Sequence, residues 1–391
     1  MKKIIYMWLV SFFSLINKVK NPQNITYLMS FNGNHDFIVQ LAKFAQQNHH
    51  KLVILYTPNC RDCISRLRDL NVETFRFKDS FSFLFHHLSK VMNSKLLFCD
   101  NYFAFLGGCH FDHSKTHIVQ LWHADGAIKT FGWEEPKTQK RSQADKRRFQ
   151  KVYDQFDEYP VGSEKMGKVF VQSYHVPFTK MSLRGYPRSD QLFDKQNQLK
   201  IQKEILMTYP ILKGKEILLY APTYRENNNG NVALQFPNDF EKVIMNLQNN
   251  QRLIIKLHPH LKSLEVKLKE KFKNKKIVWV DSFTMNDLLL ITDRLITDYS
   301  SVIFDYSLLP TAKEIIFYCY DWDQYSKEIG IQADFKEWAP GPILNTTVDL
   351  VNELAMPLLK TDFSEFNNLW NTFNDGKATQ RILNKEKQYL K

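Results

Sequence analysis

The sequence predicts an α/β protein with two doubly wound, parallel-sheet domains. After Pro22, apolar β-branched runs alternate with stretches of helical spacing, and a second such series begins near residue 216. This alternation is typical of parallel sheets that helices cover on both faces. With 391 residues, 43% of them hydrophobic, the chain is long enough to build two cores.

The predicted elements follow one another in a regular order. In the first series the strands are 25–30, 51–57, 72–77, 95–99 and 117–122, with helices at 36–47, 63–70 and 81–92. In the second series the strands are 216–220, 252–257, 276–280, 294–297 and 314–319, with helices at 239–247, 261–272, 285–291 and 302–309. The polar stretch 190–215 is predicted to link the two series. We therefore expect an N-terminal segment at 1–22 and Rossmann-like domains at 23–190 and 191–391.

The N-terminal segment contains an apolar run, 4–16, between lysines. It is shorter than the roughly 20 residues that cross a bilayer, and no small-residue cleavage pattern of a signal peptide follows it. The flanking lysines, with Trp8, Phe12 and Phe13, fit an amphipathic helix that lies in the membrane interface. A hydrophobic helix packed on the rest of the protein is the alternative.

The charge balance indicates an anionic partner. The chain has 53 Lys and Arg against 41 Asp and Glu, a net charge of +12, which suits nucleic acid, anionic lipid or a phosphate-rich substrate. The sequence contains no nucleic-acid-binding motif, so we expect no nucleic-acid partner. Basic residues crowd 137–151 and 262–276, where a solvated face is the ordinary explanation. We interpret these side chains as contacts for an anionic membrane surface or an acceptor: Lys129, Lys140, Arg141, Arg147 and Arg148.

The five cysteines form neither a disulfide framework nor a zinc motif. Cys60 and Cys63 form a Cys-x-x-Cys pair, which is typical of a redox pair or half of a zinc site. No second pair follows at zinc-finger spacing, however. We therefore expect ordinary reduced cysteines, no metal and no cofactor.

Polar residues gather where the predicted strands end. Ligands of doubly wound sheets bind beyond the carboxyl ends of the strands, and two such domains place a cleft between them, as in GT-B glycosyltransferases. At one strand end, Trp122-His123-Ala124-Asp125-Gly126 presents His123 where a general base belongs. Gly126 would let a phosphate approach the backbone, with Lys129 supplying charge. A structural histidine beside a turn is the alternative.

Further strand ends of this kind lie in the second series. Ala221-Pro222-Thr223-Tyr224-Arg225 places a hydroxyl and a guanidinium in a proline turn, suited to ribose or phosphate oxygens. Lys256-Leu257-His258-Pro259-His260 places Lys256 and His258 on one side of a strand end, and no third metal ligand adjoins them. Thr297-Asp298-Tyr299-Ser300-Ser301 begins a helix whose first turn would bind a pyrophosphate or be capped by Asp298 or Ser300. Since no glycine motif of nucleotide-triphosphate or dinucleotide enzymes occurs, the residues predict another kind of phosphate-binding cleft.

Together these segments resemble a known family. Trp122-His123-Ala124-x-Gly126-x-x-Lys129-x-Phe131-Gly132, Gly185-Tyr186-Pro187-Arg188-x-Asp190, Ala221-Pro222-Thr223-Tyr224-Arg225 and Thr297-Asp298-Tyr299-Ser300-Ser301-x-x-Phe304-Asp305 occur in the order seen in CDP-glycerol glycerophosphotransferases of teichoic acid synthesis. The resemblance covers roughly residues 95–345. It implies a GT-B type fold, an acceptor domain at 23–190 and a CDP-glycerol-binding domain at 191–391. It also implies a peripheral position on the cytoplasmic face of the bacterial cell membrane.

The resemblance implies site residues as well. His123 and His258 match catalytic positions. These residues match positions that bind CDP-glycerol: His123, Ala124, Asp125, Gly126, Ala127, Arg188, Pro222, Thr223, Lys256, Leu257, His258, Ser300, Ser301 and Asp305. The family often has arginine at the position of Lys256 and glycine at the position of Ala124.

The implied reaction moves glycerol-phosphate from CDP-glycerol to an undecaprenyl-diphosphate-linked ManNAc-GlcNAc acceptor, with His123 as general base and release of CMP. Asp100-Asn101-Tyr102-Phe103 resembles the primases (TagB/TarB), which add the first unit, whereas Ala339-Pro340-Gly341-Pro342-Ile343 resembles the polymerases (TagF/TarF). We favour a glycerol-phosphate primase over chain extension, and over a ribitol-phosphate or nucleotide-sugar transferase of the same fold. Association of the chain into a homo-oligomer stays open.

Overall fold

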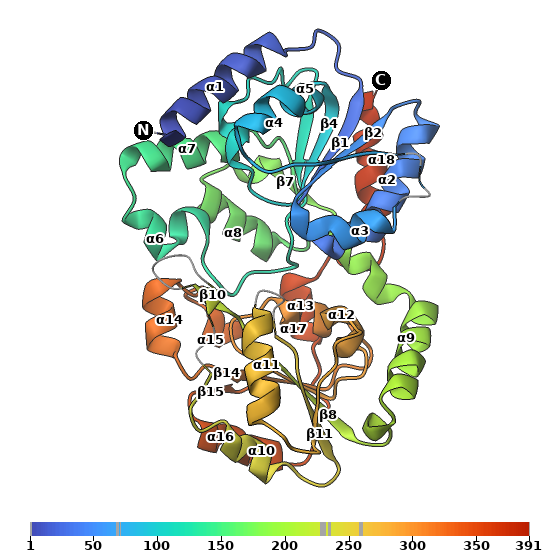
Figure 1. The fold of residues 1–391 in the computed structure, drawn as a ribbon, viewed down its shortest axis with the longest axis vertical. Coiled ribbons are helices and arrows are strands. Elements are labelled where there is room, and N and C mark those ends of the chain that lie inside the picture. The colour runs from blue at the N-terminus through green and yellow to red at the C-terminus, as the bar shows by residue number, and fades with distance from the viewer. Residues whose placement is uncertain are drawn as a thin grey trace. The chain divides into compact units, whose positions relative to one another are not determined.

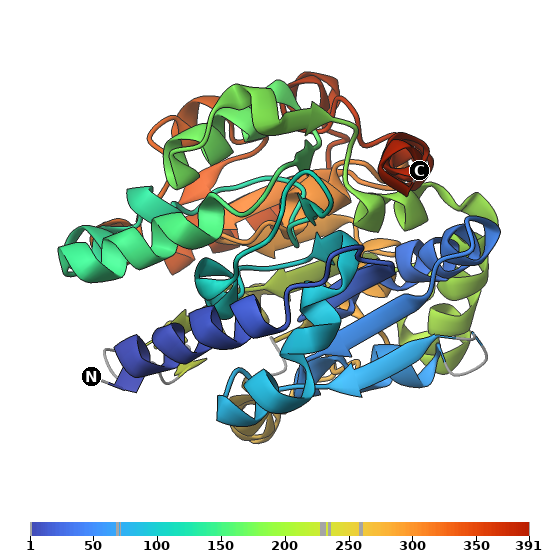
Figure 2. The same cartoon turned by 90° about the horizontal axis from the view of Figure 1, so that it is seen from above.

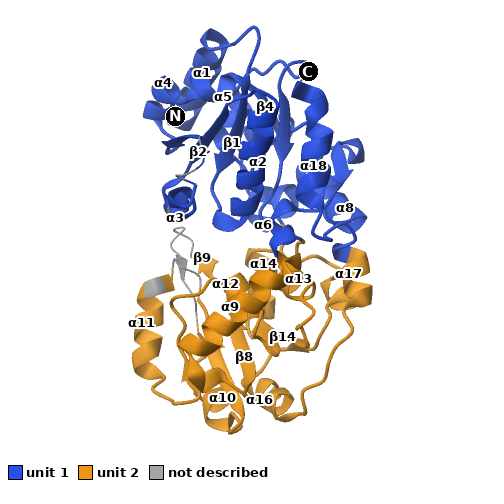
Figure 3. Cartoon of the chain, turned by 90° about the vertical axis from the view of Figure 1, so that its right-hand side faces the viewer, with its two compact units in different colours: residues 1–125, 131–191, 370–391 blue, residues 126–130, 192–369 orange. Residues whose placement is uncertain are grey.

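The computed structural model of the chain describes residues 2–67, 70, 72–226, 232–233, 236–257 and 261–390. They form two compact units (Figure 3). Unit 1 comprises residues 1–125, 131–191 and 370–391, and unit 2 comprises residues 126–130 and 192–369. Residues 370–391 thus belong to unit 1, although the sequence analysis placed all of 191–391 in a second domain.

Unit 1 is built on a parallel sheet of order β3-β2-β1-β4-β5 (Figure 1). Its strands are β1 (Asn24–Met29), β2 (Leu52–Tyr56), β3 (Glu73–Arg76), β4 (Ser94–Cys99) and β5 (His117–Gln120). The helices between them are α2 (His35–Gln47), α3 (Arg61–Ser65), α4 (Phe81–His86) and α5 (Leu88–Met92). Apolar side chains of the strands, such as Ile25, Tyr27 and Ile54, are fully buried in the core. The predicted alternation of strands and helices is therefore confirmed for this unit.

Three elements of unit 1 differ from their predictions by more than a one-residue shift of an end. Helix α3 ends at Ser65 rather than at 70, and the helix predicted at 81–92 divides at His87 into α4 and α5. Strand β5 ends at Gln120 rather than at Trp122, because Trp122 adopts a left-handed backbone with φ of 59°. An extended strand cannot contain such a residue.

The remaining elements of unit 1 were not predicted as strands and helices, apart from the N-terminal run and the basic run. They are α1 (Lys2–Ile16), α6 (Pro136–Gln139), α7 (Gln143–Tyr153), β6 (Tyr159–Val161), α8 (Glu164–Tyr174), β7 (Met181–Leu183) and α18 (Ala378–Glu386). The parallel pair β6–β7 joins the sheet through a bridge between Val119 and Glu158. The basic run is thus divided between α6 and α7, and Lys140 and Arg141 lie in the turn between them.

Helix α1 packs on unit 1 through one side only. Val10 and Ser14 are fully buried, and Phe13 packs edge-on against Phe85 of α4 at 4.9 Å between ring centroids. Figure 2 shows α1 as the dark blue helix that leads away from the N-terminus. Its other side exposes large apolar residues, among them Trp8, 75% exposed, and Phe12, 58% exposed. Among the described residues, no helix combines the length and the apolar character needed to cross a membrane.

Unit 2 is built on a second parallel sheet, of order β12-β11-β8-β13-β14-β15. Its strands are β8 (Glu216–Ala221), β11 (Gln251–Ile255), β12 (Ile277–Val278), β13 (Arg294–Thr297), β14 (Glu314–Tyr318) and β15 (Ile343–Leu344), and a separate hairpin pairs β9 (Arg225–Glu226) with β10 (Val232–Ala233). The helices are α9 (Lys195–Thr208), α10 (Glu241–Asn246), α11 (Lys262–Lys271), α12 (Met285–Leu289), α13 (Val302–Tyr306), α14 (Trp322–Glu328), α15 (Phe335–Trp338), α16 (Thr347–Ala355) and α17 (Ser364–Trp370).

Two segments of unit 2 differ from their predicted secondary structure. The stretch 190–215, predicted as a linker, contains the regular helix α9, whose Asp194 side chain caps the first turn by accepting from the Asn197 N–H at 3.0 Å. The helix predicted at 302–309 is only the five-residue α13. The linker was predicted from the polar composition of this stretch. A helix fits that composition because α9 buries only a few side chains, among them Ile205.

In both units, an aspartate fixes the loops at the centre of the sheet. Asp100 follows β4 directly, and its buried carboxylate accepts hydrogen bonds from the Ser30 and Phe31 N–H groups, at 2.9 and 3.0 Å, in the loop after β1. Asp298 follows β13 in the same way and accepts from the Thr223 N–H, at 2.8 Å, in the loop after β8. Since β1 neighbours β4 and β8 neighbours β13, each aspartate lies where the chain order of its sheet reverses. Ligands of doubly wound sheets bind at this switch point.

Candidate active site

A pocket of about 560 Å³ lies at the carboxyl edge of the unit 2 sheet. It lies between the loops after β8, β11 and β13, and therefore at the switch point of this unit. Most of the predicted donor-binding residues of unit 2 line it, together with Lys129: Pro222, Thr223, Lys256, Leu257, Ser300 and Ser301. The structure thus brings together side chains that come from strand ends far apart in the sequence.

Lys256 holds a positive charge at this pocket. It directly follows β11, and its Nζ donates to the carbonyl oxygens of Val280 and Phe283, at 3.0 and 2.7 Å. These two carbonyl acceptors orient the ammonium group at the pocket. An ammonium group oriented in this way is suited to a phosphate ligand.

Thr223 brings a hydroxyl to the same pocket. Its N–H is fixed by Asp298, and its buried Oγ1 has no hydrogen-bond partner among the described residues. A buried hydroxyl without a partner costs free energy, which a ligand oxygen would recover. The hydrogen-bonding capacity of Thr223 Oγ1 is therefore not used by the described residues.

Arg225, which the sequence analysis considered for ribose or phosphate contact, is held within unit 2. Its Nη1 lies 3.0 Å from Asp298 Oδ2, and its Nε and Nη2 donate to the two carboxylate oxygens of Asp321 at 2.8 and 3.0 Å. The guanidinium also lies 4.6 Å from the ring centroid of Tyr325. Because two carboxylates and an aromatic ring hold it, Arg225 serves to brace the loop after β8.

The Ser300–Ser301 turn departs from its prediction in one respect. Ser300 Oγ accepts from the Val302 N–H at 3.4 Å, and Asp298 accepts from Tyr299 and Thr223 rather than capping a helix. Helix α13 is short, so the dipole of a long helix does not contribute here. The turn offers hydroxyls and local N–H groups to a ligand.

Sequence reasoning missed other residues of the pocket lining: Glu265, Asp281, Thr284 and Met285. Lys269 partly offsets the two carboxylates, because its Nζ lies 2.7 Å from Glu265 and 3.0 Å from Asp281. A signal for Thr284 was present in the sequence, since Thr284 and Asp287 form a capping box at the start of α12. No comparable local signal marks Glu265, which lies on a helix face.

His123 lies in unit 1, after the end of β5. Its half-buried ring stacks on Phe31, with 4.2 Å between centroids and 17° between planes, and contacts Trp122 at 4.2 Å on a more tilted plane. Phe31 is in turn fixed by Asp100. The Trp122 N–H is bonded to Gln120 Oε1 at 2.9 Å, which stabilises the left-handed turn before His123. The imidazole is therefore held at the carboxyl edge of the unit 1 sheet.

Asp125 and Arg188 form an ion pair within unit 1. Asp125 is fully buried, and its Oδ1 accepts from Arg188 Nη1 at 2.8 Å. Both were predicted to bind the donor. The geometry gives Asp125 the role of holding Arg188, whose guanidinium has further donor groups. Ala124, next to His123, is buried.

The segment Gly126–Thr130 belongs to unit 2, where it forms backbone hydrogen bonds with the segment before α15. The Thr130 N–H donates to Gly330 at 3.1 Å, and the Gln332 N–H donates to Ile128 at 2.8 Å. This pairing carries Lys129 to the pocket. The sequence predicted that Lys129 supplies charge to a phosphate and also that it contacts a membrane surface or an acceptor. Ala127 of this segment is buried.

Gly126 was predicted to let a phosphate approach the backbone, and the structure gives a different reason for this glycine. A Cβ at this position would overlap the ring of Phe304, coming within 2.7 Å of its Cδ1. Phe304 is fully buried and stacks on Phe366 at 5.5 Å, so it has no room to move. Asp305, the neighbour of Phe304, is buried in α13 and does not line the pocket. His258 lies outside the described residues.

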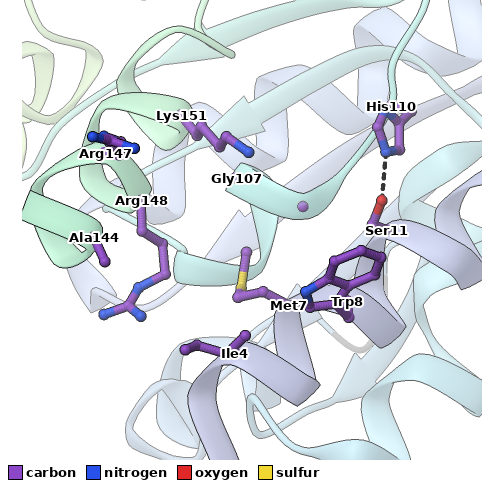
Figure 4. Close-up of a pocket in the computed structure, with 11 residues that line it drawn as sticks. Ile4, Met7, Trp8, Ser11, Gly107, His110, Ala144, Arg147, Arg148 and Lys151 are labelled. Carbon is purple, nitrogen blue, oxygen red and sulfur yellow. Dashed lines mark hydrogen bonds between the residues drawn. The ribbon is translucent and has the colours of Figure 1, made fainter. Parts of the chain in front are cut away.

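The basic residues of α7 border another pocket of unit 1, about 490 Å³ in volume. Figure 4 shows Arg147, Arg148 and Lys151 of α7 on one side and α1 residues, including Met7 and Trp8, on the other. Ser11 of α1 is hydrogen-bonded to His110 at 2.6 Å (Figure 4). Lys140 and Arg141 are exposed and lie outside this lining.

The cysteines are not arranged for thiolate or disulfide chemistry. All five are free and buried. Burial raises the pKa of Cys60 to about 12 and that of Cys63 to about 11. Both thiols therefore stay protonated at neutral pH.

Comparison with known proteins gives a consistent result. The sequence model of the family described as CDP-Glycerol:Poly(glycerophosphate) glycerophosphotransferase matches residues 77–385. A teichoic acid glycerol-phosphate primase of Bacillus subtilis is 32% identical over 370 residues, which cover 94% of this chain and 92% of that protein. A protein of the same name from Bacillus spizizenii is 31% identical and covers 97% and 96%. The solved structure of the wall teichoic acid polymerase TagF shares the fold, with a TM-score of 0.72, 21% identity, and coverage of 100% of this chain and 95% of that one.

We predict that Gly126→Ala lowers the free energy of unfolding by about 1–3 kcal/mol, because the added methyl group overpacks against Phe304. Urea unfolding followed by circular dichroism measures the change. Gly33→Ala is the control, since its Cβ would meet nothing closer than 3.7 Å. Equal stability of the Gly126 variant and the wild type would show that Phe304 does not require glycine here.

Proposed function

Since the chain belongs to the CDP-glycerol:poly(glycerophosphate) glycerophosphotransferase family, we propose that it is a teichoic acid glycerol-phosphate primase. It transfers glycerol-phosphate from CDP-glycerol to the undecaprenyl-diphosphate-linked ManNAc-GlcNAc disaccharide and releases CMP. The observation that carries this proposal is the unit 2 pocket, where Lys256 and the hydroxyls of Thr223, Ser300 and Ser301 meet at a switch point. The near full-length similarity to two primases supports the choice of the first transfer over chain extension.

Unit 2 is the donor-binding unit in this proposal. Lys256 and Lys129 attract the diphosphate of CDP-glycerol. Thr223 Oγ1, which has no hydrogen-bond partner among the described residues, donates to one of the diphosphate oxygens. The carboxylates of Glu265 and Asp281 accept from ribose or glycerol hydroxyls, a use of acidic residues that recurs in nucleotide sites of this architecture. A variant of TagF has been soaked with CDPG, which agrees with a donor of this class.

Unit 1 supplies the base and binds the acceptor. His123 takes the proton of an acceptor hydroxyl, whose oxygen forms a bond to the β-phosphorus of CDP-glycerol. The bond from that phosphorus to the bridging oxygen breaks, and CMP leaves with the electron pair. Lys256 and Arg188 stabilise the charge that develops, as would His258.

The same enzyme binds the cytoplasmic face of the membrane peripherally, through α1 and α7. The exposed apolar side of α1, with Trp8 and Phe12, lies in the lipid interface. Arg147 and Arg148 of α7 contact anionic head groups or the diphosphate of the acceptor beside it. An amphipathic surface of this kind, apolar on α1 and cationic on α7, meets the needs of an enzyme whose acceptor is anchored in lipid (Figure 4).

The first prediction concerns donor and acceptor. The full-length protein should release CMP from CDP-glycerol in the presence of the unprimed lipid-linked disaccharide and add a single unit, as judged by mass spectrometry of the product. CDP-ribitol and UDP-sugars are tested in parallel. Long products from a once-primed acceptor would indicate a polymerase instead. Turnover of CDP-ribitol or a UDP-sugar would show that this compound, and not CDP-glycerol, is the donor.

The second prediction concerns His123. His123→Ala should lower the rate of CMP release by about 100- to 10,000-fold, because the acceptor hydroxyl loses its general base. CDP-glycerol should still raise the melting temperature of the variant, since the donor pocket belongs to unit 2. His49→Ala, which removes an exposed histidine of unit 1, is the control and should be fully active. Near-normal turnover of the His123 variant would refute its role as base.

The third prediction concerns the membrane. Trp8→Ala should weaken binding to phosphatidylglycerol vesicles roughly tenfold, because a large apolar side chain no longer enters the interface. Arg147→Gln should weaken binding about fivefold at low salt and little at high salt. Met207→Ala removes an equally exposed apolar residue of unit 2 and should leave vesicle cosedimentation unchanged. Equal effects of the Trp8 and Met207 variants would argue against α1 as the contact.

A further inference from the structure

A cluster of titratable side chains lies at the end of β5 opposite to His123. His117 begins β5, Glu158 directly precedes β6, and Glu386 ends α18. All three belong to unit 1 and are buried, Glu386 completely. None of them has a part in the reaction proposed above.

The three side chains point their ligand atoms toward one another. His117 Nε2 lies 3.3 Å from Glu158 Oε2 and 3.5 Å from Glu386 Oε2. One ligand atom from each residue lies within 4.8 Å of the others. In a tetrahedral zinc site, bonds of about 2.0–2.2 Å place neighbouring ligand atoms about 3.3–3.6 Å apart. The two distances from His117 therefore agree with a shared metal ion.

Glu386 provides an independent observation. Neither oxygen of its completely buried carboxyl group has a hydrogen-bond partner among the described residues. A buried carboxyl group in this position needs either a proton or a cation.

The surroundings of the His117 ring hold its plane. The ring stacks on Tyr389 with 3.7 Å between centroids. Its Nδ1 lies 3.9 Å from Asp157 Oδ2, which is too far for a hydrogen bond, and this oxygen accepts from the Ile118 N–H at 2.8 Å. Stacking on Tyr389 therefore orients the imidazole in the cluster.

Cations in the same cluster compete with a metal ion. Lys385 Nζ forms an ion pair with Glu158 Oε2, and Arg184 Nε lies 4.0 Å from Glu158 Oε1. The side chain of Lys385 is one quarter exposed, so its ammonium group can turn toward solvent. An incoming dication would take its place on Glu158.

We propose that His117, Glu158 and Glu386 bind a divalent transition-metal ion, with Zn²⁺ as the best fit to one imidazole and two carboxylates. A water molecule or a second carboxylate oxygen completes four ligands. The ion ties α18 to β5 and to the start of β6. Its role is structural, since the cluster lies at the amino end of β5 while His123 follows the carboxyl end.

The test titrates Zn²⁺ into chelator-treated, dialysed full-length protein and follows binding by isothermal titration calorimetry. We expect one site with a Kd below about 1 µM. Glu386→Gln should weaken this site by about 100-fold. The variant should fold normally, because a neutral amide replaces a carboxyl group that has no hydrogen-bond partner among the described residues. Glu270→Gln, at an exposed position of α11, is the matched control and should bind zinc like the wild type.

A second variant gives a change of opposite sign. Lys385→Gln should tighten zinc binding roughly tenfold, because it removes a positive charge beside Glu158. His117→Gln should abolish zinc binding at this site. It replaces the Glu386 variant as the test if that variant does not fold. The proposal is overturned if the wild type binds no zinc below about 100 µM, or if these substitutions leave the tightest site unchanged.

Discussion

The carboxylate at the switch point of each sheet is the constraint on which the candidate site residues of that unit depend. Asp100 and Asp298 occupy the same place in two different sheets. Asp100 directly follows β4, the neighbour of β1, and Asp298 directly follows β13, the neighbour of β8. Each accepts hydrogen bonds from backbone N–H groups in the loop that follows β1 or β8, respectively. Phe31 can support His123, and Thr223 can line the pocket, only while these loops are fixed. Burial raises the pKa of Asp100 to about 7, while hydrogen bonds from Ser30 and Phe31 lower it, so its charge depends on these donors.

The cationic side chains of the site are held by protein groups before any ligand arrives. Lys256 donates to two carbonyl oxygens, Arg188 is paired with the buried Asp125, and Arg225 is braced by Asp298 and Asp321. Charges that are fixed in advance need little rearrangement when a diphosphate binds or when charge shifts toward a leaving group. The arrangement therefore combines attraction for an anionic donor with a rigid geometry.

Much of this architecture was predictable from the sequence, because strand ends of a parallel sheet converge on one edge. This rule placed Thr223, Lys256 and Ser300 at one sheet edge, and the three line one pocket. The family resemblance predicted from the four segments is confirmed. The long-range packing behind these residues was not predictable. Residue 126 is a glycine because Phe304 leaves no room for a Cβ, and Lys129 reaches the pocket because its segment pairs beside Ile331.

Other features had no local signal at all. Phe31 contacts His123 although the two are far apart in the sequence, and nothing around Phe31 indicates a stacking partner. The end of β5 was misplaced because a left-handed tryptophan is rare and sequence patterns do not predict it. The cluster of His117, Glu158 and Glu386 has no motif spacing, since its members come from separate elements.

Unit 1 is made of segments that lie far apart in the sequence, and this has a consequence for synthesis on the ribosome. Ile382, Leu383 and Leu390 belong to the same core as Ile25 and Tyr27, so the earliest strand and the latest helix share one interior. Residues 192–369, which belong to unit 2, emerge from the ribosome between them. Nascent unit 1 therefore cannot complete its core until residues 192–369 have been synthesised. Chaperone binding during translation would then act mainly on the half of the protein that is made first.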